Sequence, residues 1–420
     1  MTNEFKKSTV CILPWKHLFI SELGHHYPCC ITPESSAPNK LSNGAIAQFN
    51  STNNLTTLMN TSSMKKIRTE MLNGNKPEAC QRCYQLEDHQ MVSHRQGSNQ
   101  LFPFDEQQLK NETRPDGAID VELLSVDLRL GNVCNLKCRM CSPYSSKLLI
   151  PEFIKMHPEK KDQYLQLQKL DWFADQNFTD LFRKHSSILK LHFAGGEPLI
   201  IKEHSEILQK IVDAGYADKV TITYNTNFTT VPEYLKSLWT QFQGISLMVS
   251  LDGFDTVNTY IRQGSKWAVI SENIQWAEKN TEKINFTNLF FNTTVQVYNI
   301  FSLVDFFKFI IQDTKKFSLP ILSPVFFPEE FSIQILSENL KILVEERLTQ
   351  FMNSDLFVNS RFSNSEKQIF LESLKGLIQH MKNDDKSGLL PQFIKKTDFF
   401  DKERNQSVLD VVPELSTLWS

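Results

Sequence analysis

The chain has 420 residues, of which 40% are hydrophobic and 22% charged, and its formal net charge is −3. This composition is typical of a globular protein of two or three domains, and the mild acidity does not favour nucleic acid or an anionic membrane as partner. No apolar run approaches the roughly 18 residues of a membrane-spanning helix, and the N-terminus MTNEFKKSTVCILPW lacks the apolar core of a signal peptide. We therefore expect a cytoplasmic protein.

The eight cysteines all lie at or before Cys141 and form tight local groups. A disulfide framework would spread its cysteines over the structure, whereas local groups of thiols in a reducing compartment are typical of metal ligation. Five of the eight fall within residues 1–96, where a polar loop and a short helix at 63–73 precede Cys80 and Cys83. Residues 97–120, with FPFDEQQ and TRPDG, are typical of a linker.

Residues 121–328 alternate between apolar runs suited to buried strands and amphipathic helical patterns. The expected strands are VELLSVDLRL, ILKLHFA, DKVTITYNT, GISLMVSLD, INFTNLFFNTTVQV and LPILSPVFF. Strands that alternate with helices predict an α/β fold with a parallel sheet, open or curled into a barrel, and the chemistry of such folds lies at the carboxyl ends of the strands. Residues 329–420 predict a mainly helical extension, and its tail residues Asp401, Arg404, Pro413 and Glu414 either close the barrel or meet substrate.

Three cysteines, Cys134, Cys138 and Cys141, follow the first expected strand with the spacing Cx3CxxC. Three thiolates on one loop can hold three irons of a four-iron cluster and leave the fourth iron open. A structural zinc site usually has four protein ligands, and no further cysteine or histidine lies close by in sequence. Zinc stays the alternative.

A second motif, Gly195-Gly196-Glu197-Pro198, ends the next expected strand. The two glycines let the backbone approach a ligand closely, and Glu197 can accept hydrogen bonds from an ammonium group. A tight turn without a ligand is the alternative reading of this motif.

Cx3CxxC after one strand with GGEP after the next resembles the signature of the radical SAM superfamily. This resemblance implies a partial (β/α)6 barrel over 121–328, a [4Fe-4S] cluster on the three cysteines, and S-adenosylmethionine that is cleaved to a 5′-deoxyadenosyl radical, which abstracts a hydrogen atom from a substrate. It also implies that cofactor contacts come from Met140, Gly195, Gly196, Glu197, Pro198, Asn225, Asn227, Ser250, Asp252 and Arg262. For the asparagines a turn or helix cap, and for Arg262 a surface ion pair, are the alternatives.

The N-terminal order Cx12Gx4C followed by CxxC, formed by Cys11, Gly24, Cys29, Cys80 and Cys83, resembles the twitch domain, a shortened SPASM domain. The resemblance implies four thiolates that saturate an auxiliary iron–sulfur cluster, expected to be [4Fe-4S], which moves an electron. The usual order places this domain after the barrel, whereas here it comes first. Cys30 competes with Cys29 as the ligand, and a zinc site on the same cysteines is the alternative.

The expected substrate is a peptide or protein side chain, or a small molecule, and the expected electron donor is external, such as flavodoxin or ferredoxin. No nucleic acid or membrane partner is expected. The rival interpretation is a non-catalytic protein that binds zinc or an iron–sulfur cluster.

Overall fold

The computed structural model describes residues 8–32, 38–41, 43–50, 53–88 and 91–419, so the first seven residues of the N-terminal sequence lie outside the description. The chain divides into two compact units, which we describe separately. The first comprises Met1–Val133, Lys169–Thr223 and Gln241–Gln243, and the second comprises Cys134–Gln168, Tyr224–Thr240 and Gly244–Ser420. Within the described ranges, no helix combines the length and apolarity needed to cross a lipid bilayer.

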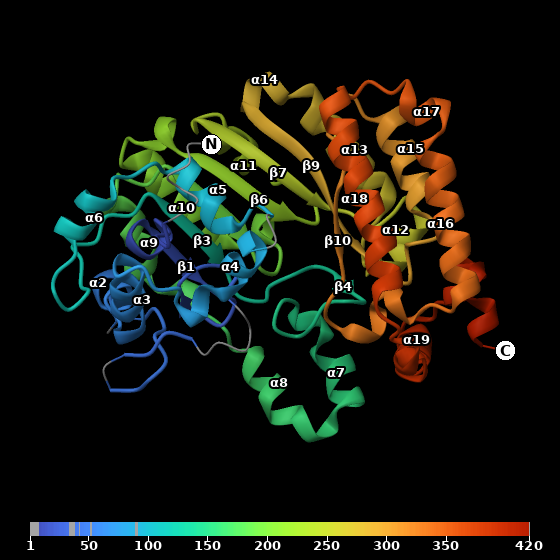
Figure 1. Ribbon diagram of the computed structural model, residues 1–420, viewed down its shortest axis with the longest axis horizontal. Coiled ribbons are helices and arrows are strands. Elements are labelled where there is room, and N and C mark those ends of the chain that lie inside the picture. Colours follow the sequence, from blue (N-terminus) through green and yellow to red (C-terminus); the bar gives the residue numbers. More distant parts are fainter. Residues whose placement is uncertain (1–7, 33–37, 42, 51–52, 89–90, 420) are drawn as a thin grey trace. The chain divides into compact units, whose positions relative to one another are not determined.

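The first unit is built on the parallel strands β1 (His17–Ile20) and β3 (Ser125–Arg129), both labelled in Figure 1, and β5 (Lys190–Ala194). The short strand β2 (His26–Tyr27) pairs antiparallel with β1. Alternate residues of a strand point to opposite faces, and the apolar set on one face is buried: Val126, Leu128, Leu191 and Phe193. The β1 strand was not expected from the sequence. Its partner β3 lies more than a hundred residues later, so the pairing leaves no local signal.

The helices of the first unit fall into an N-terminal group, which precedes β3, and a later group, which lies between β3 and β6 in the sequence. The N-terminal group is α1 (Leu13–Lys16), α2 (Leu55–Met59), α3 (Ser62–Leu72), η1 (Glu78–Cys80), α4 (Gln81–Asp88), α5 (His94–Leu101) and α6 (Glu106–Glu112). The later elements are η4 (Trp172–Ala174), α9 (Gln176–Lys184), η5 (Pro198–Ile200), α10 (Lys202–Asp213) and η6 (Ala217–Lys219). The stretch expected to be a linker therefore contains α6 and the end of α5.

The second unit contains the parallel strands β7 (Gly244–Ser250), β9 (Phe286–Val295) and β10 (Ile321–Pro324). A separate short ladder pairs β4 (Lys137–Cys138) antiparallel with β8 (Arg262–Gln263), which sets Cys138 opposite Arg262. Strand β6 (Thr221–Thr226) has residues in both units. Aromatic side chains fill the core, as in the stacked pair Phe291 and Phe317, whose ring centroids are 4.4 Å apart.

Helices make up most of the rest of the second unit. Those before residue 329 are η2 (Lys147–Leu149), α7 (Ile150–Met156), η3 (Pro158–Lys160), α8 (Lys161–Leu167), α11 (Glu233–Trp239), α12 (Thr256–Ile261), α13 (Trp267–Lys279), α14 (Thr281–Ile284) and α15 (Leu303–Asp313). Those after it are η7 (Glu329–Phe331), η8 (Ile333–Ile335), α16 (Glu338–Met352), α17 (Asp355–Val358), α18 (Asn364–Asn383), η9 (Ser387–Leu389), α19 (Leu390–Arg404), α20 (Val408–Val411) and η10 (Pro413–Leu418).

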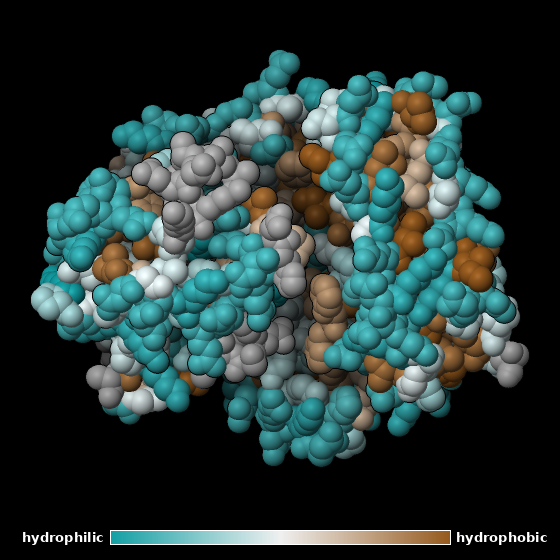
Figure 2. All heavy atoms as spheres, viewed as in Figure 1, coloured by the Kyte–Doolittle hydropathy of each residue, from teal (hydrophilic) through white to brown (hydrophobic). Residues whose placement is uncertain are grey.

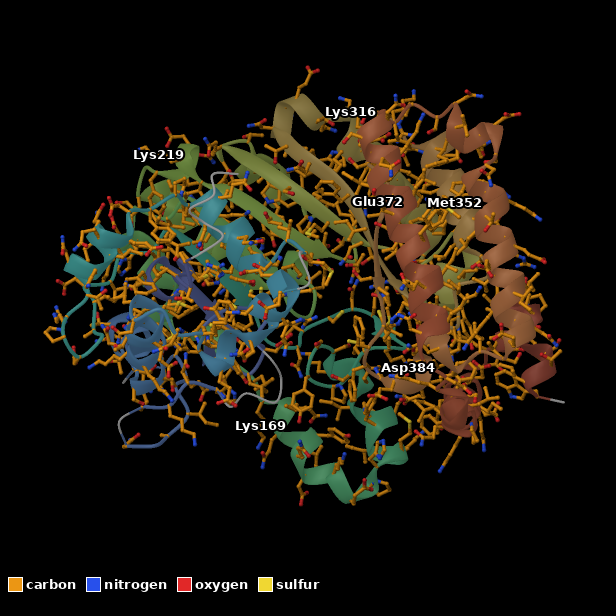
Figure 3. All side chains as sticks on the ribbon, in the orientation of Figure 1. Lys169, Lys219, Lys316, Met352, Glu372 and Asp384 are labelled. Atoms are coloured by element: carbon orange, nitrogen blue, oxygen red, sulfur yellow. The ribbon has the colours of Figure 1, made fainter. Side chains whose placement is uncertain are left out.

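The C-terminal region is helical, as expected. Figure 3 marks α16 by Met352 and α18 by Glu372, and these two helices pack against each other. Their outward surface is mainly hydrophilic (Figure 2), with scattered exposed apolar side chains such as Ile342 and Ile369. The expected α/β class, a mostly parallel sheet with intervening helices, is confirmed, and the described strands form no closed barrel.

Candidate functional site

The N-terminal thiols Cys11, Cys29, Cys80 and Cys83 of the first unit all line one cavity, together with His94 and Arg95. Cys80 ends the short helix η1 and Cys83 lies one turn later on α4, so the CxxC spacing turns both thiols to one side. This set of four thiols fits a cluster with four thiolate ligands. Among the described residues, no group of three or more His, Cys, Asp or Glu side chains lies close enough together to hold a single metal ion.

The Cys11 segment is held in place by α5, which the sequence had assigned in part to a linker. Arg95 donates to the carbonyls of Ser8 at 3.0 Å and Val10 at 2.8 Å, and it pairs with Glu87 at 2.6 Å. Asn99 accepts from the backbone N–H of Ile12 at 2.9 Å. The signal for this helix was present in the sequence, because Ser93 and Gln96 form a capping box.

Burial dominates the acidity of the cavity thiols. It raises the pKa of Cys11 well above the ordinary value, and the neighbouring thiols Cys29, Cys80 and Cys83 raise it further. The pKa values of these three thiols are raised as well, again mainly by burial. Burial therefore favours the protonated form of these thiols, and any cation held here would have to displace their protons.

The thiol of Cys30 contacts other side chains than the thiol of Cys29 does. Its Sγ is 3.6 Å from Nε2 of His94, and burial together with Asp127 raises the pKa of Cys30 to about 12. Asp127 on β3 is itself buried and pairs with His192 on β5, with 3.1 Å between Oδ2 and Nδ1. The structure thus places Cys29, and not its neighbour, among the thiols that line the cavity.

The GGEP motif forms a tight turn between β5 and η5 in the first unit. Gly195 has a φ of +108°, and a Cβ on Gly196 would lie 2.1 Å from the carbonyl oxygen of Val133. Glu197 is buried, donates its N–H to that same carbonyl at 2.8 Å, and accepts from the N–H of Leu199 at 3.2 Å. Pro198 opens η5. Both glycines are therefore required by the backbone, whether or not a ligand is bound.

The loop with Cys134, Cys138 and Cys141 opens the second unit. Burial, and then the neighbouring Cys138 and Cys134, raise the pKa of Cys141 to about 12, so the three thiols lie close enough to interact. Nδ2 of Asn227 lies 4.0 Å from Sγ of Cys134 and donates to Asn135 at 2.9 Å. The structure therefore brings Asn227, expected from its position after a strand, to the first cysteine of the loop.

Asp252 and Arg262, both expected as cofactor contacts, pair with each other, with 2.8 Å between Oδ2 and Nε. Nη1 of Arg262 also lies 3.9 Å from Sγ of Cys138. Burial opposes the charged guanidinium, but Asp252 and Cys138 outweigh it and raise the pKa of Arg262. The loop thus has a fixed positive charge beside one of its thiols, with a buried counterion.

The other expected contacts, Met140, Asn225 and Ser250, also lie in the second unit. Met140 is in the cysteine loop, Asn225 is on β6, and Ser250 ends β7. The sequence had missed Arg139, which is fully buried between two of the cysteines. Its Nη2 donates to Oδ1 of Asp401 at 2.6 Å. The signal in the sequence was the charged Arg139 inside the cysteine motif. Its partner Asp401 could not be predicted, because the two residues are 262 positions apart.

Two family models match the chain. Residues 128–303 match the Radical SAM superfamily, and residues 11–84 match an iron–sulfur cluster-binding domain, SPASM. These ranges contain the two groups of cysteines described above. The chain therefore contains a radical SAM domain preceded by a SPASM domain.

Solved structures of two proteins resemble the chain at low sequence identity. SuiB of Streptococcus suis bound to S-adenosylmethionine is 13% identical, with a TM-score of 0.34, over 69% of this chain and 63% of that one. The protein anSMEcpe with bound AdoMet is 15% identical, with a TM-score of 0.37, over 57% of this chain and 62% of that one. SuiB bound to the precursor peptide SuiA matches with 14% identity and a TM-score of 0.33, over 69% of this chain and 63% of that one. The chain thus spans less than two thirds of these proteins.

Proposed function

We propose that this protein is an enzyme that holds a [4Fe-4S] cluster on Cys134, Cys138 and Cys141 and binds S-adenosylmethionine at that cluster. When bound, the cluster and S-adenosylmethionine supply a 5′-deoxyadenosyl radical that takes a hydrogen atom from a substrate. The observation that carries the proposal is the set of contacts on the loop: Asn227 lies beside Sγ of Cys134, and the buried Arg262, paired with Asp252, lies beside Sγ of Cys138. The match of residues 128–303 to the superfamily supports it.

The residues around the loop have separate tasks in this proposal. The three thiolates hold the cluster and leave one iron without a protein ligand. Arg262 offsets negative charge at Cys138, because its guanidinium stays protonated beside Asp252. Met140, Asn225, Asn227 and Ser250 offer contacts for the adenosyl moiety. The resemblance to the superfamily assigns the methionyl ammonium to Gly195, Gly196, Glu197 and Pro198, which form the turn after β5.

The cavity of Cys11, Cys29, Cys80 and Cys83 is the proposed auxiliary cluster site, again [4Fe-4S]. Four thiolates saturate such a cluster, so it accepts or relays an electron and does not bind the substrate. Cys11 and Cys83 are buried, and Cys29 and Cys80 are half-buried. Held by these four thiolates, such a cluster would supply a one-electron acceptor, which an oxidative reaction of the substrate would need.

The substrate class and the domain limits are also part of the proposal. A peptide or protein side chain is the first class and a small molecule the second, with an external one-electron donor such as flavodoxin or ferredoxin. The proposed domains are 1–96 for the auxiliary cluster, 97–120 as a connection, 121–328 for the radical SAM domain and 329–420 as the extension.

Anaerobic reconstitution tests the proposal. The wild-type protein should bind about eight irons, as expected for two four-iron clusters. When reduced and given S-adenosylmethionine, it should form 5′-deoxyadenosine. The triple variant Cys134→Ala/Cys138→Ala/Cys141→Ala should retain about half of the iron and form none. Zinc in place of iron, or a full cluster without cleavage, would instead support the non-catalytic binding protein.

A further inference from the structure

The C-terminal helix α19 makes direct contact with the cysteine loop, although it lies well beyond the residues that match the superfamily. Arg139, between Cys138 and Cys141, is fully buried. Its Nη2 donates to Asp401 of α19 at 2.6 Å and to Gln406 at 2.9 Å. A buried guanidinium needs such an acceptor, because removing a cation from water is costly unless it is paired and hydrogen-bonded.

The carboxylate of Asp401 is in turn fully engaged. Oδ1 also accepts from the hydroxyl of Tyr260 at 2.9 Å, and Oδ2 accepts from the N–H of Val408 at 2.7 Å. The Tyr260 ring lies under the guanidinium, with 3.6 Å between the ring centroid and Cζ of Arg139. Arg139 therefore contacts the Asp401 carboxylate through Nη2 and the Tyr260 ring through the face of its guanidinium, while Tyr260 and Val408 also donate to that carboxylate.

A second buried pair connects the same helix to the beginning of the loop. Nη2 of Arg404 lies 2.7 Å from Oε2 of Glu152 on α7, and Oε1 of Glu152 accepts from Lys137 at 2.6 Å. Lys137 directly precedes Cys138. Asp401 and Arg404 are three residues apart, so both project from one face of α19. That face therefore contacts Arg139 directly and is linked to Lys137 through Glu152, so it is connected to the residues on both sides of Cys138.

We propose that α19 is part of the cofactor site, and that Asp401 and Arg404 are positioning residues that set the geometry of the loop of Cys134, Cys138 and Cys141. The proposal rests on the proposed function only in assuming that this loop holds a cluster. Without Asp401, the charge of Arg139 would be buried and uncompensated. The loop could relieve this only by moving Arg139 toward water, which would displace Cys138 and Cys141.

Release of iron to a chelator tests this role in the reconstituted full-length protein. Asp401→Asn should lose about half of its iron roughly tenfold faster than wild type, because partners that orient metal ligands affect metal affinity by about this factor or more. The auxiliary half should leave at the wild-type rate. The electron paramagnetic resonance signal of the reduced cluster with S-adenosylmethionine should also change, which a loss of global stability alone would not produce.

Glu403→Gln is the matched control on the same helix. Glu403 pairs with Lys155 in the solvent, where the exposed fractions of the two side chains are 24% and 58%. Its iron release and spectrum should equal those of wild type. If Asp401→Asn does not fold, Asp401→Glu keeps the charge but misplaces the carboxylate, and it should show the same change to a smaller degree. Equal release from the folded Asp401 variant and from Glu403→Gln would overturn the proposal.

Alkylation of the cluster-free protein separates this proposal from the proposed function. Iodoacetamide should label Cys138 and Cys141 faster in Asp401→Asn than in Glu403→Gln, whereas Cys83 in the other unit should react equally in both. A wild-type loop that takes up no iron would contradict the proposed function while faster labelling still supported the positioning role. Equal labelling of the two variants would contradict the positioning role alone.

Discussion

Nη2 of Arg139 lies 2.6 Å from Oδ1 of Asp401, although 262 residues separate them in the sequence. The first belongs to the loop that carries Cys138 and Cys141, and the second to a helix close to the C-terminus. A buried charged pair stabilises a fold only when both partners are present. This relationship makes the stability of the C-terminal region and that of the cysteine loop depend on each other.

A double-mutant cycle on this pair should show strong coupling. Asp401→Leu alone should lower the free energy of unfolding by about 3–5 kcal/mol, because Arg139 is left buried without a counterion. Arg139→Met/Asp401→Leu should recover most of that loss, since apolar side chains can replace a buried ion pair. Urea unfolding followed by circular dichroism measures the free energy of unfolding of each variant. Costs that add within about 0.5 kcal/mol would show that the two residues act independently.

Cys29 and Cys30 should behave differently as auxiliary-site residues. Cys29→Ser should remove the auxiliary iron, about half of the total if two four-iron clusters bind, because Cys29 lines the cavity with three other thiols. Cys30→Ser should retain the iron, because Cys30 contacts His94 instead. Iron and sulfide analysis of both variants measures this. Loss of iron from Cys30→Ser alone would reverse the assignment.

Gly196→Ala should disrupt the turn that follows β5. The new Cβ would meet the carbonyl oxygen of Val133 at 2.1 Å, so the backbone would have to move, and 5′-deoxyadenosine formation should fall at least about tenfold, as small misplacements of a site can cost more than that. Gly376→Ala is the control. It lies inside α18 with open space around it and should stabilise the protein by about 0.5–1 kcal/mol. Unchanged activity of Gly196→Ala would contradict a role for this close approach.

Acidification should destabilise the protein in part through His204. Burial lowers the pKa of His204 from 6.5 to about 3, so this residue binds no proton in the folded state between those values while the unfolded chain does. Its contribution is complete above pH 6.5 and is lost as the pH falls toward 3. His204→Leu should therefore reduce the loss of unfolding free energy between pH 6.5 and 5 by about 1 kcal/mol per pH unit on average, a slope that approaches about 1.4 at lower pH. Urea unfolding at both pH values measures the slope, and equal slopes for the two proteins would contradict a buried neutral His204.

The features that could be predicted from the amino-acid sequence are those whose signal is local. The spacing of Cys134, Cys138 and Cys141, with GGEP after the next strand, identified the superfamily, because cluster ligation and a close backbone turn each need particular residues within a few positions. The alternation of apolar runs and helical patterns predicted the α/β class for the same reason. Strand and helix periods are local properties of the chain.

Contacts between segments that are distant in the chain could be seen in the folded protein alone. Strand β1 is defined by its pairing with β3, and α5 holds the Cys11 segment in place. Cys29 lines the cavity with the other thiols, whereas Cys30 does not. The pair of Arg139 and Asp401 is a further contact of this kind. Such contacts depend on how whole elements pack, and a buried charge gives no sign in the sequence of the partner that neutralises it.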